Sequence, residues 1–121
     1  MAKRIRHSEL LARRWGEMSV VEQMANVGSE VERAIRAHEA GNPERFEHAF
    51  ERALELFDLT VADGRWGGCR LRELARAREE FRALFYGDEG AWPTVARVRS
   101  YYLQFAVAAR RRMTTAGGGG A

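Results

Sequence analysis

Histidine and cysteine, which carry out much of acid–base and nucleophilic catalysis and bind transition metals, are few and scattered in this sequence. Its 121 residues include three histidines, His7, His38 and His48. Ile35 and Arg45 stand three residues before the last two, so the Glu-x-x-His pairs that bind di-iron centres in helical bundles are absent. His38 falls on an apolar helical face near a helix end, a position that favours a packing residue. We therefore expect no metal ion, no cofactor and no catalytic residue.

A single cysteine, Cys69, limits the chemistry further. It excludes a disulfide within the chain and a four-cysteine zinc site. A lone thiol fits a reducing compartment, so we expect a cytoplasmic protein in which Cys69 is a bystander. The apolar stretch at residues 10–12 is too short for a secretion signal, and no apolar run is long enough to cross a membrane.

Basic side chains are concentrated at the two ends of the sequence. Residues 1–14 carry five cations and one acid, a net charge of +4, and residues 97–112 carry five arginines and no acid, a net charge of +5. The segment between them, residues 15–96, carries ten cations and sixteen acids, a net charge of −6. Nineteen of the twenty cations are arginine, whose planar fork suits bidentate contacts with anions. The two basic ends are therefore the first candidates for a binding surface.

These basic ends meet if the chain forms an up-down-up-down bundle, because the first long helix then begins where the last one ends. The binding residues that we expect at this basic pole are Arg65, Trp66, Arg70, Arg72, Arg110, Arg111 and Arg112. Clustered guanidinium groups attract polyanions, and exposed tryptophans such as Trp15 and Trp66 could stack on bases. Three interpretations stay open: the pole binds nucleic acid, it binds an acidic protein, or it only complements a helix dipole while Trp66 folds into the core.

A second group of residues could form a polar site in the interior. Arg78 occupies an apolar register position of its predicted helix and is expected to lie level with Gly28 and Tyr102. Gly28 would leave room there, and a buried guanidinium must be paired or hydrogen-bonded, so Arg78 could bind an anion or a small ligand. The favoured interpretation is structural: Arg78 contacts the Tyr102 hydroxyl or a carboxylate, or extends to solvent.

Four long helices are needed to position these residues. Apolar side chains recur at helical spacing in segments that predict helices over residues 20–40, 43–63, 70–86 and 94–112. Ser19 and Glu22 have the spacing of a capping box, and Asn42–Pro43 supplies an N-cap and a first helical residue. Residues 1–18 are expected to form a basic N-terminal arm or a short helix, and residues 113–121 a disordered glycine-rich tail. The acids of the second helix share one face, which predicts a solvent-exposed stripe of Glu44, Glu47, Glu51, Glu55 and Asp58.

Part of the chain resembles a known helical motif. The segment from Gly41 to Leu56, GNPERFEHAFERALEL, resembles the middle of a tetratricopeptide repeat, with Gly41, Phe50, Ala53 and Leu54 at that motif's glycine, aromatic, alanine and leucine positions. Phe46 stands where the motif has a small residue, and no second copy follows 34 residues on. The resemblance therefore implies one tightly packed helical hairpin and no peptide-binding array.

The chain as a whole resembles a family of short bacterial all-helical proteins of uncharacterised function. The resemblance rests on the stretches MANVGSEVERAI, AFERALELFDLT, RLRELARARE and YYLQFAVAARR, and it implies no activity. In size and architecture the chain also resembles HEPN-type helical ribonucleases. Those enzymes carry an arginine and a histidine on a late helix, and the last two predicted helices here contain no histidine, which counts against that activity.

The sequence thus predicts an all-α, antiparallel up-down-up-down four-helix bundle with a short N-terminal helix or arm. The function that we expect is that of a non-enzymatic, cytoplasmic protein-interaction module, which binds a protein partner or a second copy of itself. The alternative is a nucleic-acid-binding protein that uses the basic pole. A third class, an enzyme or a small-molecule sensor, would centre on Arg78 and Tyr102.

Overall fold

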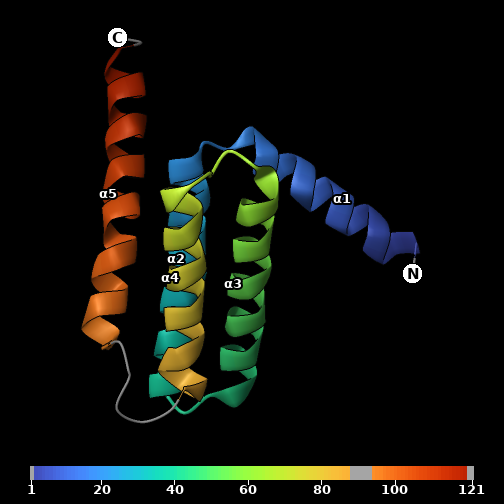
Figure 1. Ribbon diagram of the computed structural model, residues 1–121, viewed down its shortest axis with the longest axis vertical. Helices are drawn as coiled ribbons and strands as arrows, with labels where there is room; N and C mark the ends of the chain where they lie inside the picture. Colours follow the sequence, from blue (N-terminus) through green and yellow to red (C-terminus); the bar gives the residue numbers. More distant parts are fainter. Residues whose placement is uncertain (1, 88–93, 120–121) are drawn as a thin grey trace.

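The protein folds into five α-helices, and the four longer ones form an antiparallel bundle (Figure 1). In the computed structural model, the backbone is described for residues 2–87 and 94–119, and the side chains for residues 10–87 and 94–112. No β-strand occurs in the described part of the chain, so the all-α prediction is confirmed. The helices are α1 (Ala2–Glu17), α2 (Val20–Glu39), α3 (Pro43–Asp63), α4 (Cys69–Tyr86) and α5 (Val95–Gly119).

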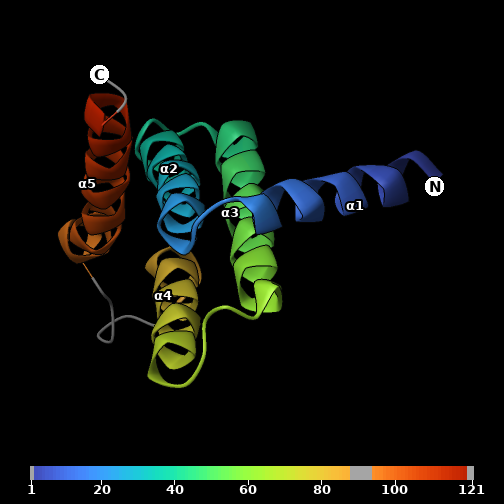
Figure 2. The ribbon, with the colours of Figure 1, turned by 90° about the horizontal axis from the view of Figure 1, so that it is seen from above.

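Helix α2 is the central element of the bundle. It packs most extensively against α3 and α5, while α4 lies beside both α3 and α5 and makes fewer contacts with each. Viewed from above, α5, α2 and α3 stand in a row and α4 covers one side (Figure 2). Helix α1 contacts α3 and leaves the bundle at the end where α2 begins. The start of α2, the α3–α4 connection and the C-terminal part of α5 therefore share one end of the molecule.

The observed helix boundaries follow the capping signals in the sequence. The Ser19 hydroxyl accepts a hydrogen bond from the backbone N–H of Glu22 at 3.1 Å, and the Asn42 side chain accepts one from the N–H of Arg45 at 3.2 Å. Both contacts satisfy backbone donors that a helix start leaves free. Gly41 then reverses the chain between α2 and α3 with a φ of 68°, a conformation that side chains disfavour.

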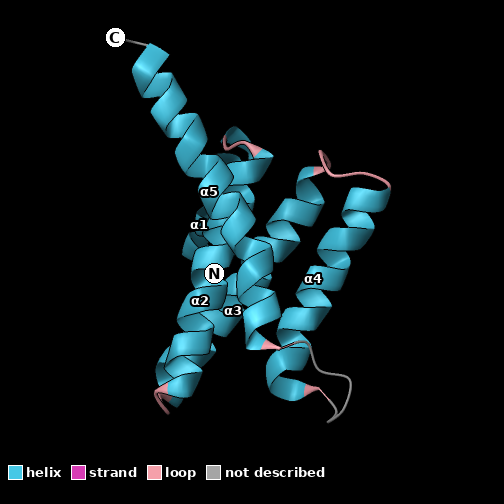
Figure 3. Ribbon diagram, turned by 90° about the vertical axis from the view of Figure 1, so that its left-hand side faces the viewer, coloured by secondary structure: helices cyan, strands magenta, loops and turns pink. Residues whose placement is uncertain are grey.

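Both terminal helices extend further than the sequence predicted. Helix α1 begins at Ala2 and spans nearly all of the segment 1–18, for which an arm or a short helix was expected, and α5 continues to Gly119, through most of the expected glycine-rich tail. Apolar periodicity ends near residue 112, but backbone hydrogen bonds can continue a helix without apolar side chains. The C-terminal part of α5 consequently stands clear of α4 (Figure 3).

The core forms where the predicted apolar stripes meet. The largest fully buried side chains include Phe57 of α3, Phe81 of α4 and Met24 of α2. The acidic stripe of α3 is exposed along its whole length, as predicted, because its buried face lies on the opposite side of the helix. The His38 ring packs against Phe46 and Phe85, with centroid separations of 5.4 and 5.0 Å, in agreement with the packing interpretation.

Candidate functional site

Several residues of the predicted basic pole do come together at one end of the bundle. Arg65, Trp66, Arg70 and Arg112 line one shallow hollow, bordered by the start of α2 and by Phe105. Arg72 is exposed one helical turn into α4. Arg110 and Arg111 line other hollows, because successive residues of a helix point 100° apart. The residues of the basic pole are therefore close together, but their arginines line three separate hollows and do not form one binding surface.

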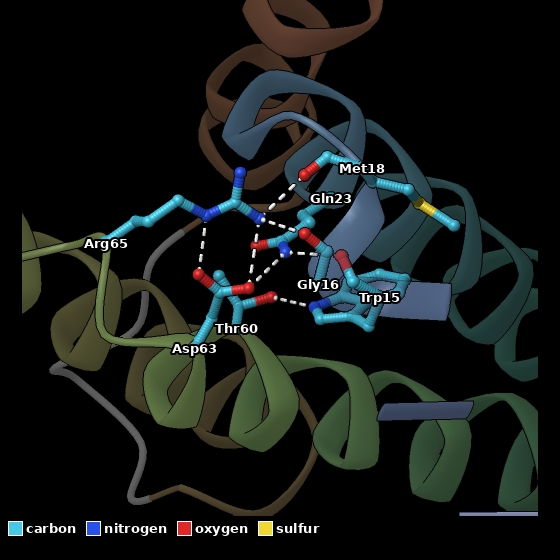
Figure 4. A network of polar contacts seen from close by, with 7 residues as sticks. All are labelled: Trp15, Gly16, Met18, Gln23, Thr60, Asp63 and Arg65. Atoms are coloured by element: carbon cyan, nitrogen blue, oxygen red, sulfur yellow. Dashed lines mark hydrogen bonds and ion pairs between the residues drawn. The ribbon is translucent and has the colours of Figure 1, made fainter. Parts of the chain in front are cut away.

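The Arg65 side chain is 41% exposed, but its guanidinium is engaged in contacts within the protein and does not present a free cation. Its guanidinium donates to the Asp63 carboxylate at 2.5 and 2.9 Å. The same group donates to the backbone carbonyls of Gly16 at 3.3 Å and Met18 at 2.6 Å (Figure 4). It thereby joins the end of α3 to the turn between α1 and α2. The sequence-based assignment of Arg65 as a binding residue misses this structural role.

The two tryptophans of the pole are buried, so the prediction that they are exposed for base stacking is wrong. Trp66 retains 7% of its exposed surface and Trp15 retains 3%. The Trp15 indole N–H donates to the Thr60 hydroxyl at 2.9 Å, inside the contact between α1 and α3. Trp66 belongs to the buried core, as in the alternative interpretation. Burying the large apolar surface of an indole ring stabilises the fold, which favours the core over an exposed position for both tryptophans.

Gln23 completes the polar network that holds α1 to the bundle. Its side-chain N–H₂ donates to the backbone carbonyl of Trp15 at 2.7 Å and to the Asp63 carboxylate at 3.0 Å (Figure 4). The Arg65 guanidinium, and then the Gln23 amide, hold the pKa of Asp63 below its ordinary value. Gln23, Asp63 and Arg65 thus link four elements in one network: α1, α2, α3 and the loop after α3.

This carboxylate makes stability depend on pH in a defined direction. Because the pKa of Asp63 is lower in the folded state, its ionised form stabilises the fold above the unfolded pKa of about 3.9, and this contribution is lost as the pH falls through the folded value. We expect Asp63→Asn to lower stability at neutral pH and to flatten the loss of stability below about pH 4. Denaturant unfolding at neutral and acidic pH measures both effects. Arg65→Gln should reduce the same acid-dependent loss, and an unchanged pH profile in both variants would contradict this assignment.

Elsewhere in the bundle, most arginines are paired with acids. Ion pairs engage Arg33, Arg36, Arg52, Arg78, Arg82, Arg97 and Arg99. Apart from Arg45 at the far end, the arginines that pair with no acid among the described side chains lie near the C-terminal end of α1, in the first half of α4 and in the C-terminal half of α5: Arg13, Arg14, Arg70, Arg72, Arg76, Arg110, Arg111 and Arg112. The unneutralised positive charge is therefore concentrated at and beside the basic pole.

Helix α5 contributes a surface that the sequence-based site did not include. Leu103 is 61% exposed and Val107 is 38% exposed, although both belong to a long helix of the bundle. Together with Ser100, Gln104, Ala108 and Arg111 they line a shallow hollow on the outer side of α5. Their spacing of four residues places them on one helical face. This outer face of α5 is apolar at its centre and basic at its C-terminal end.

The outer face of α5 continues into a groove between α2 and α5. Ser29 of α2 and Ala96, Ser100 and Ala106 of α5 supply small side chains to this groove, and Leu103 lines it as well as the outer hollow. Below it, α2 and α5 approach closely, since a Cβ built on Gly28 would lie 2.9 Å from the Cβ of Tyr102. The α2–α5 groove and the outer face of α5 thus form one continuous surface.

Ion pairs fix α5 on α2 along this groove. Arg99 donates to both carboxylate oxygens of Glu32 at 3.0 Å and to Glu39 at 3.2 Å. Arg36 also donates to Glu32, at 3.1 Å. Burial disfavours the ionised form of Glu32, but the hydrogen bonds from Arg99 and Arg36 outweigh it and lower the pKa of Glu32. The charged form is therefore maintained, and the bidentate contact fixes the register of the two helices.

The predicted interior site is only half assembled. Gly28 and Tyr102 touch, as their expected positions imply, but Arg78 is directed elsewhere. Its guanidinium pairs with Asp58 of α3 at 3.2 Å and with Glu79 at 3.6 Å, on the side of α4 that faces α3. Burial raises the pKa of the Tyr102 hydroxyl, which stays neutral and has no hydrogen-bond partner among the described residues. Arg78 therefore takes the carboxylate contact of the structural interpretation.

The sequence contained a signal for the surface that was missed. Leu103 and Val107 lie outside the main apolar stripe of their helix, which runs through Val98, Tyr102 and Phe105. Two aliphatic residues four positions apart on the polar side of a helix mark a second apolar face. A helix with two apolar faces at the edge of a bundle leaves one of them without a partner.

The described residues form neither a metal site nor a membrane-spanning helix. No group of three or more histidine, cysteine, aspartate or glutamate side chains there is placed to hold a metal ion. Cys69 is exposed and unpaired at the start of α4. None of the described helices is both long enough and apolar enough to cross a membrane.

Comparisons with known proteins supply no further guide. No family model, no curated protein and no solved structure matches the chain. The resemblances to a tetratricopeptide hairpin and to short bacterial helical proteins therefore stay predictions.

Proposed function

We propose that the chain is a non-enzymatic, cytoplasmic protein-interaction module that acts through the outer face of α5 and the adjoining α2–α5 groove. The polar side chains of the interior support this proposal, because the buried Gln23 and Thr60 and the half-buried Asp63 are occupied in contacts that hold the helices together. The free thiol of Cys69 supports a reducing compartment. The proposal leaves room for a partner protein or for a second copy of the chain.

One observation carries the proposal: Leu103 and Val107 remain exposed on a helix that has its other face in the core. Scattered apolar residues are ordinary on protein surfaces, but here two lie on one helical face and border a groove. Basic residues flank them, and arginine is enriched in protein interfaces. The arrangement has the form of an interface, with an apolar centre and a polar rim.

The proposal predicts that Leu103 and Val107 are required for binding. We expect the tagged protein to retain one or more discrete proteins from a nuclease-treated lysate of its source, and the double variant Leu103→Gln, Val107→Gln to lose them. Both side chains are exposed, so the variant should fold with a stability within about 0.5 kcal/mol of the wild type.

A matched control separates this surface from general stickiness. Val61 is 39% exposed, nearly the same fraction as the 38% of Val107, but it lies on α3 and not on α5. Val61→Gln should retain the same proteins as the wild type. The assignment of this surface is wrong if the wild type, the double variant and Val61→Gln all retain the same lysate proteins. It is also wrong if nuclease treatment abolishes retention by the wild type.

The unpaired arginines favour a second candidate, a nucleic-acid-binding protein. Arg70, Arg72 and Arg110–Arg112 are exposed at the basic pole. With Trp15 and Trp66 buried, such binding would rest on phosphate contacts and lack the stacking that single strands use. It would therefore be steeply salt-dependent, and replacing Arg110–Arg112 with glutamine would flatten the dependence. Titration of single- and double-stranded RNA and DNA at physiological salt distinguishes the candidates, since non-specific binders reach about 10⁻⁴ to 10⁻⁶ M there.

A further inference from the structure

We infer that the α2–α5 groove binds a short, acidic, amphipathic helix from another protein. This inference rests on the proposed function and names the chemistry of the partner. Helix-in-groove recognition needs an apolar groove, anchor positions along it and a charge pattern that selects the partner. The groove between α2 and α5 supplies each of these from described side chains.

The length and profile of the groove suit a helix. Along α5 it runs from Ala96 to Arg110, which is about 21 Å at the helical rise, or about four turns. Leu103 stands near the middle of that span and is 61% exposed, so it can be covered without rearrangement. The neighbouring groove residues Ser29, Ser100 and Ala106 are small. Bulky apolar side chains of the incoming helix would therefore supply most of the contact area.

The charges around the groove select an acidic partner. Arg33 and Arg36 line it from α2, and Arg99 and Arg110 from α5. Three of these arginines are paired with acids, Arg33 with Glu30, Arg36 with Glu32, and Arg99 with Glu32 and Glu39. Arg110 pairs with no acid among the described side chains, so the four cations exceed the three acids and the rims keep a positive charge. Between residues 95 and 112 the chain has no acid at all. A helix with acidic residues beside its apolar stripe would complement both rims, whereas a basic helix would be repelled.

The same charges argue against a second copy as the occupant. Two α5 helices placed side by side would bring Arg110–Arg112 near the other copy's Arg97 and Arg99 if antiparallel, and near its Arg110–Arg112 if parallel. Like charges at an interface are strongly unfavourable. The exposed stripe of α3 is acidic, but the leucines beside it, Leu54 and Leu59, are partly buried against the core of their own chain and are not free to anchor in the groove. The partner must carry both features on one helix.

Synthetic peptides test this inference on the full-length protein. The probe is a helical peptide of about 16 residues with leucines spaced three and four apart and glutamates on both flanks. We expect fluorescence anisotropy to give a dissociation constant in the micromolar range that rises with salt. A peptide with the same leucines and lysine in place of glutamate should bind at least about tenfold more weakly. Leu103→Gln should weaken binding of the acidic peptide by about tenfold, the loss of one central anchor, whereas Val61→Gln should leave it unchanged.

Each outcome of this test is decisive. Equal binding of the acidic and basic peptides, insensitivity to Leu103→Gln, or no binding of the acidic peptide at about 1 mM overturns the inference. Tight binding of generic double-stranded DNA that competes with the acidic peptide and ignores Leu103→Gln also overturns it, in favour of a nucleic-acid surface. If native partners still depend on Leu103 while the acidic peptide does not bind, the proposed function stands and only the partner chemistry is wrong.

Discussion

Replacement of Trp15 with alanine is expected to lower the free energy of unfolding by about 3–5 kcal/mol, the usual cost of truncating a buried tryptophan. Trp15 is almost completely buried, and its indole N–H donates to Thr60 of α3. Its backbone carbonyl also accepts a hydrogen bond from Gln23. The substitution would leave a cavity between α1 and the bundle and an unsatisfied group on Thr60. A small domain has a total stability of about 5–15 kcal/mol, so this loss is large.

Chemical denaturation followed by circular dichroism measures the effect. Leu10→Ala is the matched control, because Leu10 lies on the same helix and is 58% exposed, and it should change stability by less than about 0.5 kcal/mol. Trp15→Phe keeps most of the side-chain volume and removes the indole donor. Its loss of unfolding free energy should therefore lie between those of Trp15→Ala and Leu10→Ala. If Trp15→Ala is as mild as Leu10→Ala, α1 does not pack against the bundle through Trp15.

A leucine at Gly28 should destabilise the protein by about 1–3 kcal/mol through overpacking. Even a Cβ at this position would lie 2.9 Å from the Tyr102 Cβ, closer than side chains normally approach. The clashing atom belongs to the fixed base of the Tyr102 side chain, so relief requires α2 and α5 to separate. Separation would strain the contacts of Arg99 with Glu32 and Glu39. The higher helix propensity of leucine, worth less than 1 kcal/mol, opposes the effect without cancelling it.

Thermal unfolding of Gly28→Leu beside Ser29→Leu tests this expectation. Ser29 is exposed on the same helix, so a leucine there should leave the melting temperature close to that of the wild type. A lower melting temperature for Gly28→Leu alone is the expected result. Unchanged stability in both variants would mean that α2 and α5 lie further apart than the structure shows, and the α2–α5 groove would have a different shape.

Local sequence signals were sufficient to predict the bundle. The residues that mark helix starts, Ser19 and Asn42–Pro43, form the expected caps, and apolar periodicity identified the buried faces. These features depend on side chains within one or two helical turns, which is the range over which sequence patterns are readable. The acidic stripe of α3 was predictable for the same reason.

The candidate site was less predictable because its key contacts join residues far apart in sequence. Arg65 stands among basic residues, yet it bonds to the carbonyls of Gly16 and Met18, 49 and 47 positions away. Trp15 finds its partner, Thr60, 45 positions away. Arg78 was assigned to the interior from its register, but α4 turns this position toward Asp58 on α3. Charge and register alone could not show which cations are already paired and which remain free.

The outer face of α5 shows the opposite case, in which the residues were readable from the sequence but their exposure was not. Leu103 and Val107 were visible in the sequence as aliphatic residues on a polar face, but only their exposure in the folded bundle shows that none of the described helices covers them. Their importance depends on the tertiary arrangement and on the distribution of unpaired arginines beside them.

Site-specific photo-crosslinking in the native cell tests the interaction surface most directly. A photoreactive amino acid introduced at Leu103 lies at the centre of the outer face of α5, and one introduced at Val61 serves as the control on α3. We expect one or a few discrete protein adducts from position 103, resistant to nuclease and absent from position 61. Adducts that are the same from both positions, that consist of nucleic acid, or that do not form at position 103 would contradict this expectation.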